Sequence, residues 1–274
     1  MRIQAFHGLR YDGVADPGAL AAPPFDQIDD RLRDRFHQTP HHFAHLSRPV
    51  PEDGLDAPHH AAAKHEAWVR DGILRQDSEP ALYANEIVLP AGERRRGLTA
   101  LVGIEPPDSP IIRPHEETLA KAIADRLELL RAMRVDLEPM LLLADDGGAL
   151  DGMLAADCGG EPLVEHRDAD GNLQRLFRVA DAGRVASYRR TLADAPGLIA
   201  DGHHRYKVAS LYAAERAAGP DTPAACKLAV ITSLASPALT IDPIHRAFAE
   251  APSLGPLRSL ARCQPLAEPT GAGA

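Results

Sequence analysis

The densest group of side chains capable of chemistry lies in residues 199–209, whose sequence is IADGHHRYKVA. Gly202 permits a sharp turn, and a helix that starts near Arg205 would direct unpaired N–H groups and a positive dipole end at that turn. Asp201 could hold a metal ion or accept a proton. Three side chains carry donors suited to phosphate oxygens: His203, His204 and Arg205. We therefore predict an anion-binding turn at residues 201–205, and the alternative is that Asp201 only caps the helix and pairs with Arg205.

A second cluster, RPHEET at residues 113–118, comes just before a run that is typical of a helix. Thr118 is placed to cap that helix, and Pro114 keeps the residue before it extended. His115 beside Glu116 in a loop offers a proton acceptor or a carboxylate ligand for magnesium. The cluster is therefore a second candidate for acid–base chemistry, and the alternative is a solvated start of the helix.

Two further groups of histidines have spacings of three and four residues, which can place metal ligands on one helix face. They are His41, His42 and His45, and His59, His60 and His65. Prolines at 40 and 58 put both groups near loops and no cysteine accompanies them, so a zinc site is disfavoured. The sequence also lacks a Walker phosphate-binding loop, a G-x-G-x-x-G turn after a strand and a G-x-S-x-G motif. Their absence argues against P-loop NTPases, Rossmann domains and common hydrolases.

The composition is that of an ordinary globular protein, with 274 residues, 45% of them hydrophobic and 25% charged. The net charge of −9 lacks the basic field that non-specific nucleic-acid binding requires, so we expect no nucleic-acid partner. No apolar stretch has the length of a signal peptide or a membrane span, so we expect a cytoplasmic protein without a membrane partner. Three widely spaced cysteines, Cys158, Cys226 and Cys263, fit a reducing compartment. The oligomeric state stays open.

Periodicity places the two clusters on a framework of helices and strands. Apolar spacing predicts helices at residues 28–36, 58–75, 118–134, 184–195 and 206–218. Alternation and short apolar runs predict strands at residues 82–89, 98–104, 140–144, 197–200, 227–234 and 239–241. Asp170-Gly171 predicts a hairpin turn, and the charged run 92–97 predicts a solvated hairpin tip, with a phosphate contact as its alternative. We therefore predict an α/β or α+β fold, a mixed β-sheet with flanking helices.

The clearest helix is that at 118–134, because its apolar residues line one face: Leu119, Ile123, Leu127 and Leu130. We expect residues 1–250 to form the folded domain, with two subdomains at about 1–145 and 146–250 as an option. Residues 251–274 are rich in Ala, Pro and Gly, so we expect a disordered tail there.

Six short motifs are distributed along the chain from residue 3 to about residue 248. They are FHGLRY at 6–11, APPFD at 22–26, RRGLTAL at 95–101, PHEETL at 114–119, DRLELLRA at 125–132 and DGHHRY at 201–206. Each motif alone is weak, but their combination resembles the DUF1015 family of bacterial and archaeal proteins.

The resemblance implies a function for the turn. DGHHR is similar to the phosphate-contacting motif of the ParB and sulfiredoxin-like superfamily, whose members use nucleotides, and some DUF1015 proteins are ATP-dependent L-serine kinases. ATP or another nucleotide, with magnesium, is thereby the implied cofactor, and a free amino acid, serine, is the implied substrate. The implied nucleotide-binding residues are His115, Gly202, His203, His204 and Arg205. The implied catalytic residues are Glu116, Asp201 and His204, and the implied metal ligands are Asp201 and Glu116.

Two other functions stay open from the sequence. A non-catalytic nucleotide-binding switch would keep the turn but would need no carboxylate near the γ-phosphate. A catalytically silent family member is suggested by Glu117 and Ile123, which stand where family sequences usually carry basic residues. A serine site also needs a cation for the carboxylate, for which the candidates are Arg48, Arg95 and Arg113. Kinase activity further requires that the RPHEET cluster lie beside the DGHHR turn.

Overall fold

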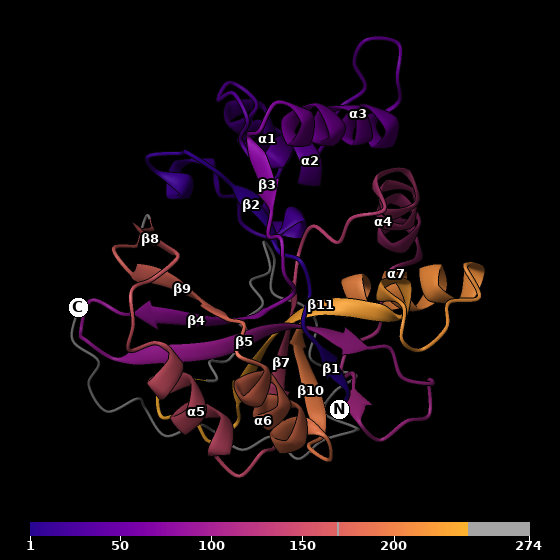
Figure 1. The fold of residues 1–274 in the computed structure, drawn as a ribbon. Helices are drawn as coiled ribbons and strands as arrows, with labels where there is room; N and C mark the ends of the chain where they lie inside the picture. The colour runs from indigo at the N-terminus through magenta and orange to yellow at the C-terminus, as the bar shows by residue number, and fades with distance from the viewer. Residues whose placement is uncertain (169, 241–274) are drawn as a thin grey trace, which may run out of the picture. The chain divides into compact units, whose positions relative to one another are not determined.

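The computed structural model describes residues 1–168 and 170–240, and Met1–Leu239 form one compact unit. Within the described residues, a nine-stranded sheet has the order β6-β10-β7-β11-β5-β4-β9-β8, with β1 beside β5 (Figure 1). Its strands are β1 Ile3–Gln4, β4 Leu82–Val88, β5 Arg94–Gly103, β6 Ile112–Arg113, β7 Met140–Ala144, β8 Val164–Arg167, β9 Leu173–Val179, β10 Gly197–Asp201 and β11 Cys226–Ser233. The pairs β6–β10 and β7–β11 are parallel and the others antiparallel, so the predicted mixed sheet with flanking helices is confirmed.

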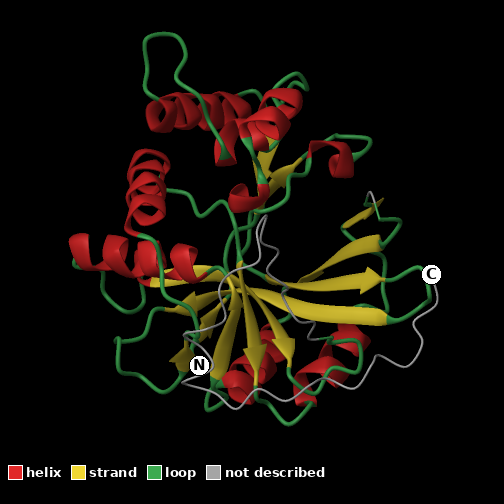
Figure 2. Cartoon of the chain, turned by 180° about the vertical axis from the view of Figure 1, so that it is seen from behind, coloured by secondary structure: helices red, strands yellow, loops and turns green. Residues whose placement is uncertain are grey.

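Helices lie on both sides of this sheet. In the described part of the chain they are α1 Asp30–Phe36, α2 Ala44–Ser47, α3 Ala57–Arg70, α4 Ala120–Met133, α5 Ala149–Asp157, α6 Ala182–Leu192 and α7 His203–Glu215, with short 3-10 helices η1 Pro17–Leu20, η2 Phe25–Gln27 and η3 Pro223–Ala225. Helices α5 and α6 cover one side, while α7 lies on the other with α4 and then α3 beyond it (Figures 1 and 2). Strands β2 (Leu9–Tyr11) and β3 (Leu74–Gln76) form a separate two-stranded ribbon, which lies beside α1 to α3 (Figure 1).

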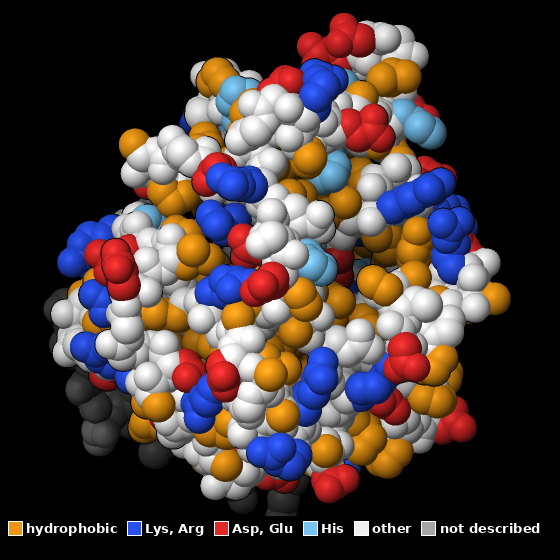
Figure 3. Space-filling view, viewed as in Figure 1, with side chains coloured by type: hydrophobic (Ala, Val, Ile, Leu, Met, Phe, Trp, Pro, Cys, Tyr) orange, Lys and Arg blue, Asp and Glu red, His pale blue; other side chains and the backbone are white. Residues whose placement is uncertain are grey.

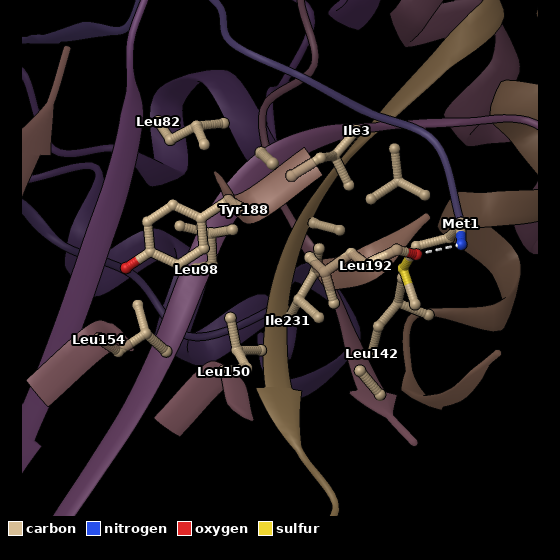
Figure 4. Close-up of a cluster of buried hydrophobic side chains, with 14 of the residues drawn as sticks. Met1, Ile3, Leu82, Leu98, Leu142, Leu150, Leu154, Tyr188, Leu192 and Ile231 are labelled. Atoms are coloured by element: carbon tan, nitrogen blue, oxygen red, sulfur yellow. Dashed lines mark hydrogen bonds between the residues drawn. The ribbon is translucent and has the colours of Figure 1, made fainter. Parts of the chain in front are cut away.

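The main hydrophobic core lies between the sheet and helices α5 and α6. Leu150 and Leu154 of α5 and Tyr188 and Leu192 of α6 are fully buried against strand residues (Figure 4). The ammonium group of Met1 donates to the Leu192 carbonyl at 2.5 Å, which fixes the first strand to α6. A second, smaller core joins α2, α3, β3 and α4 through Leu46, Ala61, Trp68, Leu74, Leu129 and Met133. Helix α4 therefore belongs to the helical layer and also borders α7.

The start of α4 differs from the prediction. The helix begins at Ala120, and its N-cap, Leu119, has no side-chain capping bond, so the expected Thr118 cap is wrong. Leu119 was expected on the apolar face, but it is 71% exposed because it precedes the first helical turn. Its N–H is bound instead by a ring nitrogen of His204 at 2.9 Å. This contact ties the helix start to a residue far along the chain.

The arginine run at 94–96 belongs to a strand. The turn is closed by hydrogen bonds between Leu89 and residues 92 and 93, and β5 begins at Arg94. Arg94 Nη1 and Arg96 Nε each lie 3.0 Å from a carboxylate oxygen of Glu86, whose side chain is 1% exposed. The predicted solvated tip is therefore wrong for Arg96, which is only 16% exposed beside the buried carboxylate on β4, whereas Arg94 and Arg95 are exposed as predicted.

The chain does not divide into two structural halves, and its predicted last strand does not form in the described residues. The strand predicted at 239–241 is absent from its described residues, Leu239 and Thr240. The tail predicted at 251–274 lies outside the described residues. Strands from before and after residue 145 interleave in one sheet, since β10 and β11 flank β7. The two sequence halves thus share the main hydrophobic core.

The surface is charged and mixed. On the face drawn in Figure 3, acidic and basic side chains are interspersed with each other over the sheet and the helices. Among the helices that the structure describes, none combines the length and the apolar character needed to cross a membrane.

Candidate functional site

The DGHHR turn, residues 201–205, joins the end of β10 to the start of α7. Gly202 has a φ of +95°, and a Cβ atom there would lie 3.0 Å from the Cβ of Met140 and 3.1 Å from its Cα. Only glycine fits this position without strain. Helix α7 starts at His203, earlier than predicted, and its N-cap Gly202 makes no side-chain capping bond. The first N–H groups of this 13-residue helix therefore lack a side-chain cap, as an anion-binding helix end requires.

Asp201 and Arg205 form an ion pair across this turn. Arg205 Nη2 lies 2.5 Å from Asp201 Oδ2, and Arg205 Nη1 donates to the carbonyl of Pro139. The Arg205 side chain is 9% exposed, whereas that of Asp201 is 52% exposed. The predicted pairing of Asp201 with Arg205 is thus confirmed, whereas the predicted capping of the helix by Asp201 is wrong. Arg205 is directed into the protein, and Asp201 remains accessible.

His203 joins the turn to the RPHEET loop, residues 113–118. Its Nε2 accepts the N–H of His115 at 3.2 Å, and the two rings meet edge to face at 4.5 Å. The accepting Nε2 places the ring proton on Nδ1, which lies 3.6 Å from Glu116 Oε2. Burial lowers the pKa of His203, and the charge of His115 lowers it further, while Glu116 opposes the shift. His203 is therefore a neutral, buried ring that positions the loop.

His204 holds the other end of the same loop. Its Nε2 accepts the N–H of Leu119 at 2.9 Å. The contacts made by the two histidines join segments that are 88 and 85 residues apart in sequence. The requirement that the RPHEET loop lie beside the DGHHR turn is met. The structure brings the predicted site residues together: His115, Glu116, Asp201, Gly202, His203, His204 and Arg205.

The titration of His203 gives a direct test of this geometry. We expect its imidazole to titrate below its ordinary pKa of 6.5, because burial and His115 disfavour the charged ring. Glu116→Gln should lower the midpoint further, since it removes a carboxylate that favours the charged ring. NMR of the histidine Cε1–H signals at stepped pH measures both midpoints. A midpoint above 6.5, or a rise in the variant, would contradict the arrangement.

The same shift links protonation of His203 to stability. As the pH falls, the unfolded chain, in which the histidine has its ordinary pKa, binds the proton at a higher pH than the folded protein does. The free energy of unfolding is therefore maintained above about pH 6.5 and falls as the pH drops below that value. Protonation of Nε2 would also break the bond from the His115 N–H.

Two carboxylates are available to a magnesium ion here, those of Asp201 and Glu116. Their side chains are 52% and 61% exposed, and Arg205 occupies one oxygen of Asp201. In the described ranges, no group of three His, Cys, Asp or Glu side chains could hold a metal on its own. Magnesium in phosphoryl-transfer sites keeps several waters and binds one or two carboxylates together with substrate phosphates. The two residues fit an ion that arrives with a nucleotide.

Buried charges that the sequence pattern does not predict lie next to the turn. Lys227 of β11 is 3% exposed and pairs with Asp136, and it also donates to the Glu138 carbonyl at 2.6 Å. Pro139, the next residue, accepts the Arg205 bond. Burial lowers the pKa of Lys227 and raises that of Glu138. The available signal was a lysine within the otherwise apolar strand CKLAVITS, where a charge requires a buried partner.

The other histidine groups pack elsewhere in the helical layer. His42 stacks on Phe36 at 4.1 Å and His45 on His37 at 4.3 Å. Burial, with a smaller effect of His37, lowers the pKa of His45 to about 4. His41 and His45 each meet the Trp68 ring edge to face, at 5.4 and 6.2 Å. They make no hydrogen bond to the DGHHR turn in the part of the chain that is described.

Comparison with known proteins yields one match. The family model described as Protein of unknown function (DUF1015) matches residues 3–267, which is nearly the whole chain. Neither a curated protein nor a solved structure matches the chain.

Proposed function

The chain belongs to the DUF1015 family, and we propose that it is an ATP-dependent kinase that converts free L-serine to O-phosphoserine in the cytoplasm. The observation that carries this proposal is the contact between the DGHHR turn and the RPHEET loop. It brings an uncapped helix N-terminus, two accessible carboxylates and three histidine rings into one location. Phosphoryl transfer needs little more than such positioning, charge neutralisation and a weak base.

Each residue has a role in this proposal. The N-terminus of α7 receives nucleotide phosphate, and Gly202 lets the backbone approach closely. His204 adds a donor through the ring nitrogen that the loop does not use, and His115 faces the same region. His203 positions the loop, while Arg205 orients Asp201. The substrate is a small molecule, with neither a nucleic acid nor a membrane as partner.

The transfer itself needs one proton acceptor. The serine Oγ forms a bond to the γ-phosphorus as the bond from that phosphorus to the β–γ bridging oxygen breaks, so that ADP leaves. Glu116, whose carboxylate is 61% exposed, accepts the hydroxyl proton, and Asp201 is the second carboxylate able to do so. Magnesium, held by these carboxylates and the phosphates, would neutralise charge on the transferred group.

A nucleotide-binding switch without catalysis is the second candidate. It is favoured by the number of contacts that the site already makes internally, because both histidines hold the loop and Arg205 is bound to Asp201 and Pro139. Such a turn can bind phosphate and transmit its presence to the RPHEET loop without transferring it. Catalytic silence, suggested by Glu117 and Ile123, is the third candidate.

Serine-dependent ADP release tests the kinase. The full chain is mixed with magnesium, ATP and a panel of free amino acids, and ADP is followed by a coupled assay. We expect release with L-serine, and a loss of about 100-fold in kcat/KM for Glu116→Gln and at least tenfold for His204→Ala. Glu117→Gln is the matched control, because it removes the neighbouring exposed carboxylate and should change the rate less than about threefold.

The outcomes separate the three candidates. No turnover with any amino acid, together with ATP binding that Gly202→Ala abolishes, would replace the kinase by the switch. Neither turnover nor binding would leave a silent family member. Turnover that is equal in Glu116→Gln and in the wild type would keep the kinase but remove Glu116 as its base.

A further inference from the structure

A hydroxyl group lies in the RPHEET loop beside the DGHHR turn, and the chemistry above gives it no role. It belongs to Thr118, the one residue of this loop that carries an alcohol. The expected cap of α4 by Thr118 does not form, because Leu119 is the N-cap residue and makes no side-chain capping bond. The Thr118 hydroxyl is therefore not committed to the start of the helix.

Two hydrogen bonds hold the part of the loop that contains Thr118 against the first turn of α7. His203 Nε2 accepts the N–H of His115 at 3.2 Å. His204 Nε2 accepts the N–H of Leu119 at 2.9 Å. Only two covalent bonds separate the Thr118 Cα from the Leu119 nitrogen, so this Cα lies within about 6 Å of His204 Nε2. Thr118 cannot leave the turn unless that hydrogen bond breaks.

The exposure of neighbouring residues shows on which side of the loop the Thr118 side chain lies. Leu119 is 71% exposed and Glu117 is also exposed, whereas Thr118 between them is half-buried. The Thr118 side chain is thus turned toward the protein, and the element bonded to the loop at this point is the first turn of α7. Because Thr118 is only half-buried, small molecules in solution have access to it.

A proton acceptor lies two residues before Thr118. The Glu116 carboxylate is 61% exposed, and its Oε2 lies 3.6 Å from His203 Nδ1. A carboxylate can take the proton of an alcohol as the alcohol attacks phosphorus. One short loop therefore carries an alcohol and a base next to the turn to which we assign phosphate binding.

We propose that Thr118 is phosphorylated within its own chain when no free amino acid is present. This inference rests on the proposed kinase, because the phosphate donor is ATP bound at the DGHHR turn. Thr118 Oγ1 forms a bond to the γ-phosphorus as the bond from that phosphorus to the β–γ bridging oxygen breaks. ADP leaves, and the hydroxyl proton passes to the Glu116 carboxylate. The product is a phosphothreonine on the loop that borders the site.

The position of Thr118 just before α4 stabilises this product. Leu119 is bonded to His204 at the starts of α4 and α7. Arg131 pairs with Glu215 near the ends of the same helices, so the two helices run in the same direction. Their N-termini therefore lie together, and neither N-cap residue makes a side-chain capping bond. Helix N-termini favour negative charge, so both helix ends stabilise a phosphate attached to Thr118.

Incubation of the full chain with magnesium and ATP, without serine, tests the modification. Mass spectrometry of the intact chain follows the gain of one phosphate, and peptide sequencing at neutral pH locates it. We expect phosphate on residue 118 in the wild type and in Thr118→Ser. We expect none in Thr118→Val, which keeps the shape of the side chain but lacks the hydroxyl. Glu116→Gln should slow the modification about 100-fold.

Controls connect the result to this site and to transfer within one chain. Thr39→Val removes an exposed threonine between α1 and α2 and should leave the modification unchanged. Gly202→Ala displaces the turn and should slow the modification at least tenfold in protein that thermal melts show to be folded. The rate per chain should not change with protein concentration. An unmodified wild type, phosphate on another residue, a rate that rises with protein concentration, or equal rates in Gly202→Ala and the wild type would each overturn the inference.

The inference and the proposed serine kinase can fail independently. Phosphorylation of Thr118 without serine-dependent ADP release would support the inference and reject free serine as the substrate. Serine-dependent ADP release without any phosphate on Thr118 would support the serine kinase and reject the inference.

Discussion

Asp136→Ala is expected to lower the free energy of unfolding by about 3–5 kcal/mol, because it leaves a buried ammonium group without its counter-ion. The Lys227 side chain is 3% exposed, and its Nζ bonds to Asp136 and to the Glu138 carbonyl. Asp136 Oδ2 also accepts the N–H of Leu228 at 2.8 Å, so the variant loses a second hydrogen bond, near the start of β11. Urea unfolding followed by circular dichroism measures the change through the shift in midpoint.

The loss of stability in Asp136→Ala should come from the unpaired buried charge of Lys227 and not from the removal of the Asp136 side chain itself. Lys227→Met combined with Asp136→Ala removes both charges, and we expect it to recover most of the lost stability. Asp221→Ala is the matched control, because Asp221 pairs with Arg2 at 3.5 Å but is 94% exposed. It should cost less than about 1 kcal/mol. If Asp136→Ala were no more costly than this surface control, the buried pair would not stabilise the fold.

The decrease in the free energy of unfolding caused by Asp136→Ala should become smaller as the pH rises. Burial lowers the pKa of Lys227, and Asp136 raises it. The pKa of Lys227 is therefore lower in the Asp136→Ala variant than in the wild type. A lysine whose folded pKa lies below its unfolded value holds fewer protons when folded, so stability rises with pH between the two values. The difference between variant and wild type should therefore be smaller at about pH 10 than at about pH 7.

Local patterns predicted the strands and the helices that carry the site. The antiparallel pair β4–β5, the strand β7, the hairpin around Gly171 and the strand-turn-helix of residues 197–215 all follow from apolar spacing and turn residues within one segment. Helix α5 was missed because Gly152 and the run Asp145-Asp146-Gly147-Gly148 are typical of a loop. The helix forms because Leu150 and Leu154 are buried against the sheet and Asp146 accepts the N–H of Leu150 at 2.6 Å. Strands β1, β2, β3 and β6 have only two or three residues, too few to show a period.

The sequence predicted which residues form the candidate site, but it did not predict the contacts between them. The DGHHR and RPHEET clusters stand out by composition, whereas the bonds from His203 and His204 to the loop join residues more than 80 positions apart. The buried pair Lys227 and Asp136 was missed because charged residues are usually solvated. Only packing shows that Arg126 stacks on Phe25 of the APPFD motif, a motif that single-sequence patterns describe only as extended backbone.

Gly202→Ala is the second prediction with a large effect, and it tests the turn directly. We expect a loss of about 3 kcal/mol in the free energy of unfolding, because a left-handed φ costs a residue with a Cβ about 1–2 kcal/mol and the new atom crowds its neighbour. The φ is +95°, and the Cβ would lie 3.0 Å from Met140 Cβ, 3.1 Å from Met140 Cα and 3.2 Å from Arg205 Cζ. Since Met140 begins β7 in the core, the turn has to move instead.

The activity of the Gly202→Ala variant shows whether the turn has a functional role in addition to its structural one. Displacing the turn shifts the first N–H groups of α7 away from the RPHEET loop, so serine-dependent ADP release should fall at least tenfold under conditions where the variant is still folded. Gly152→Ala is the matched control, because nothing lies within 4 Å of a Cβ at Gly152 in α5. It should stabilise the protein by about 0.5–1 kcal/mol and leave activity unchanged. A folded Gly202→Ala variant with full activity would show that phosphate binds elsewhere, and a variant as stable as the wild type would show that the turn tolerates a side chain.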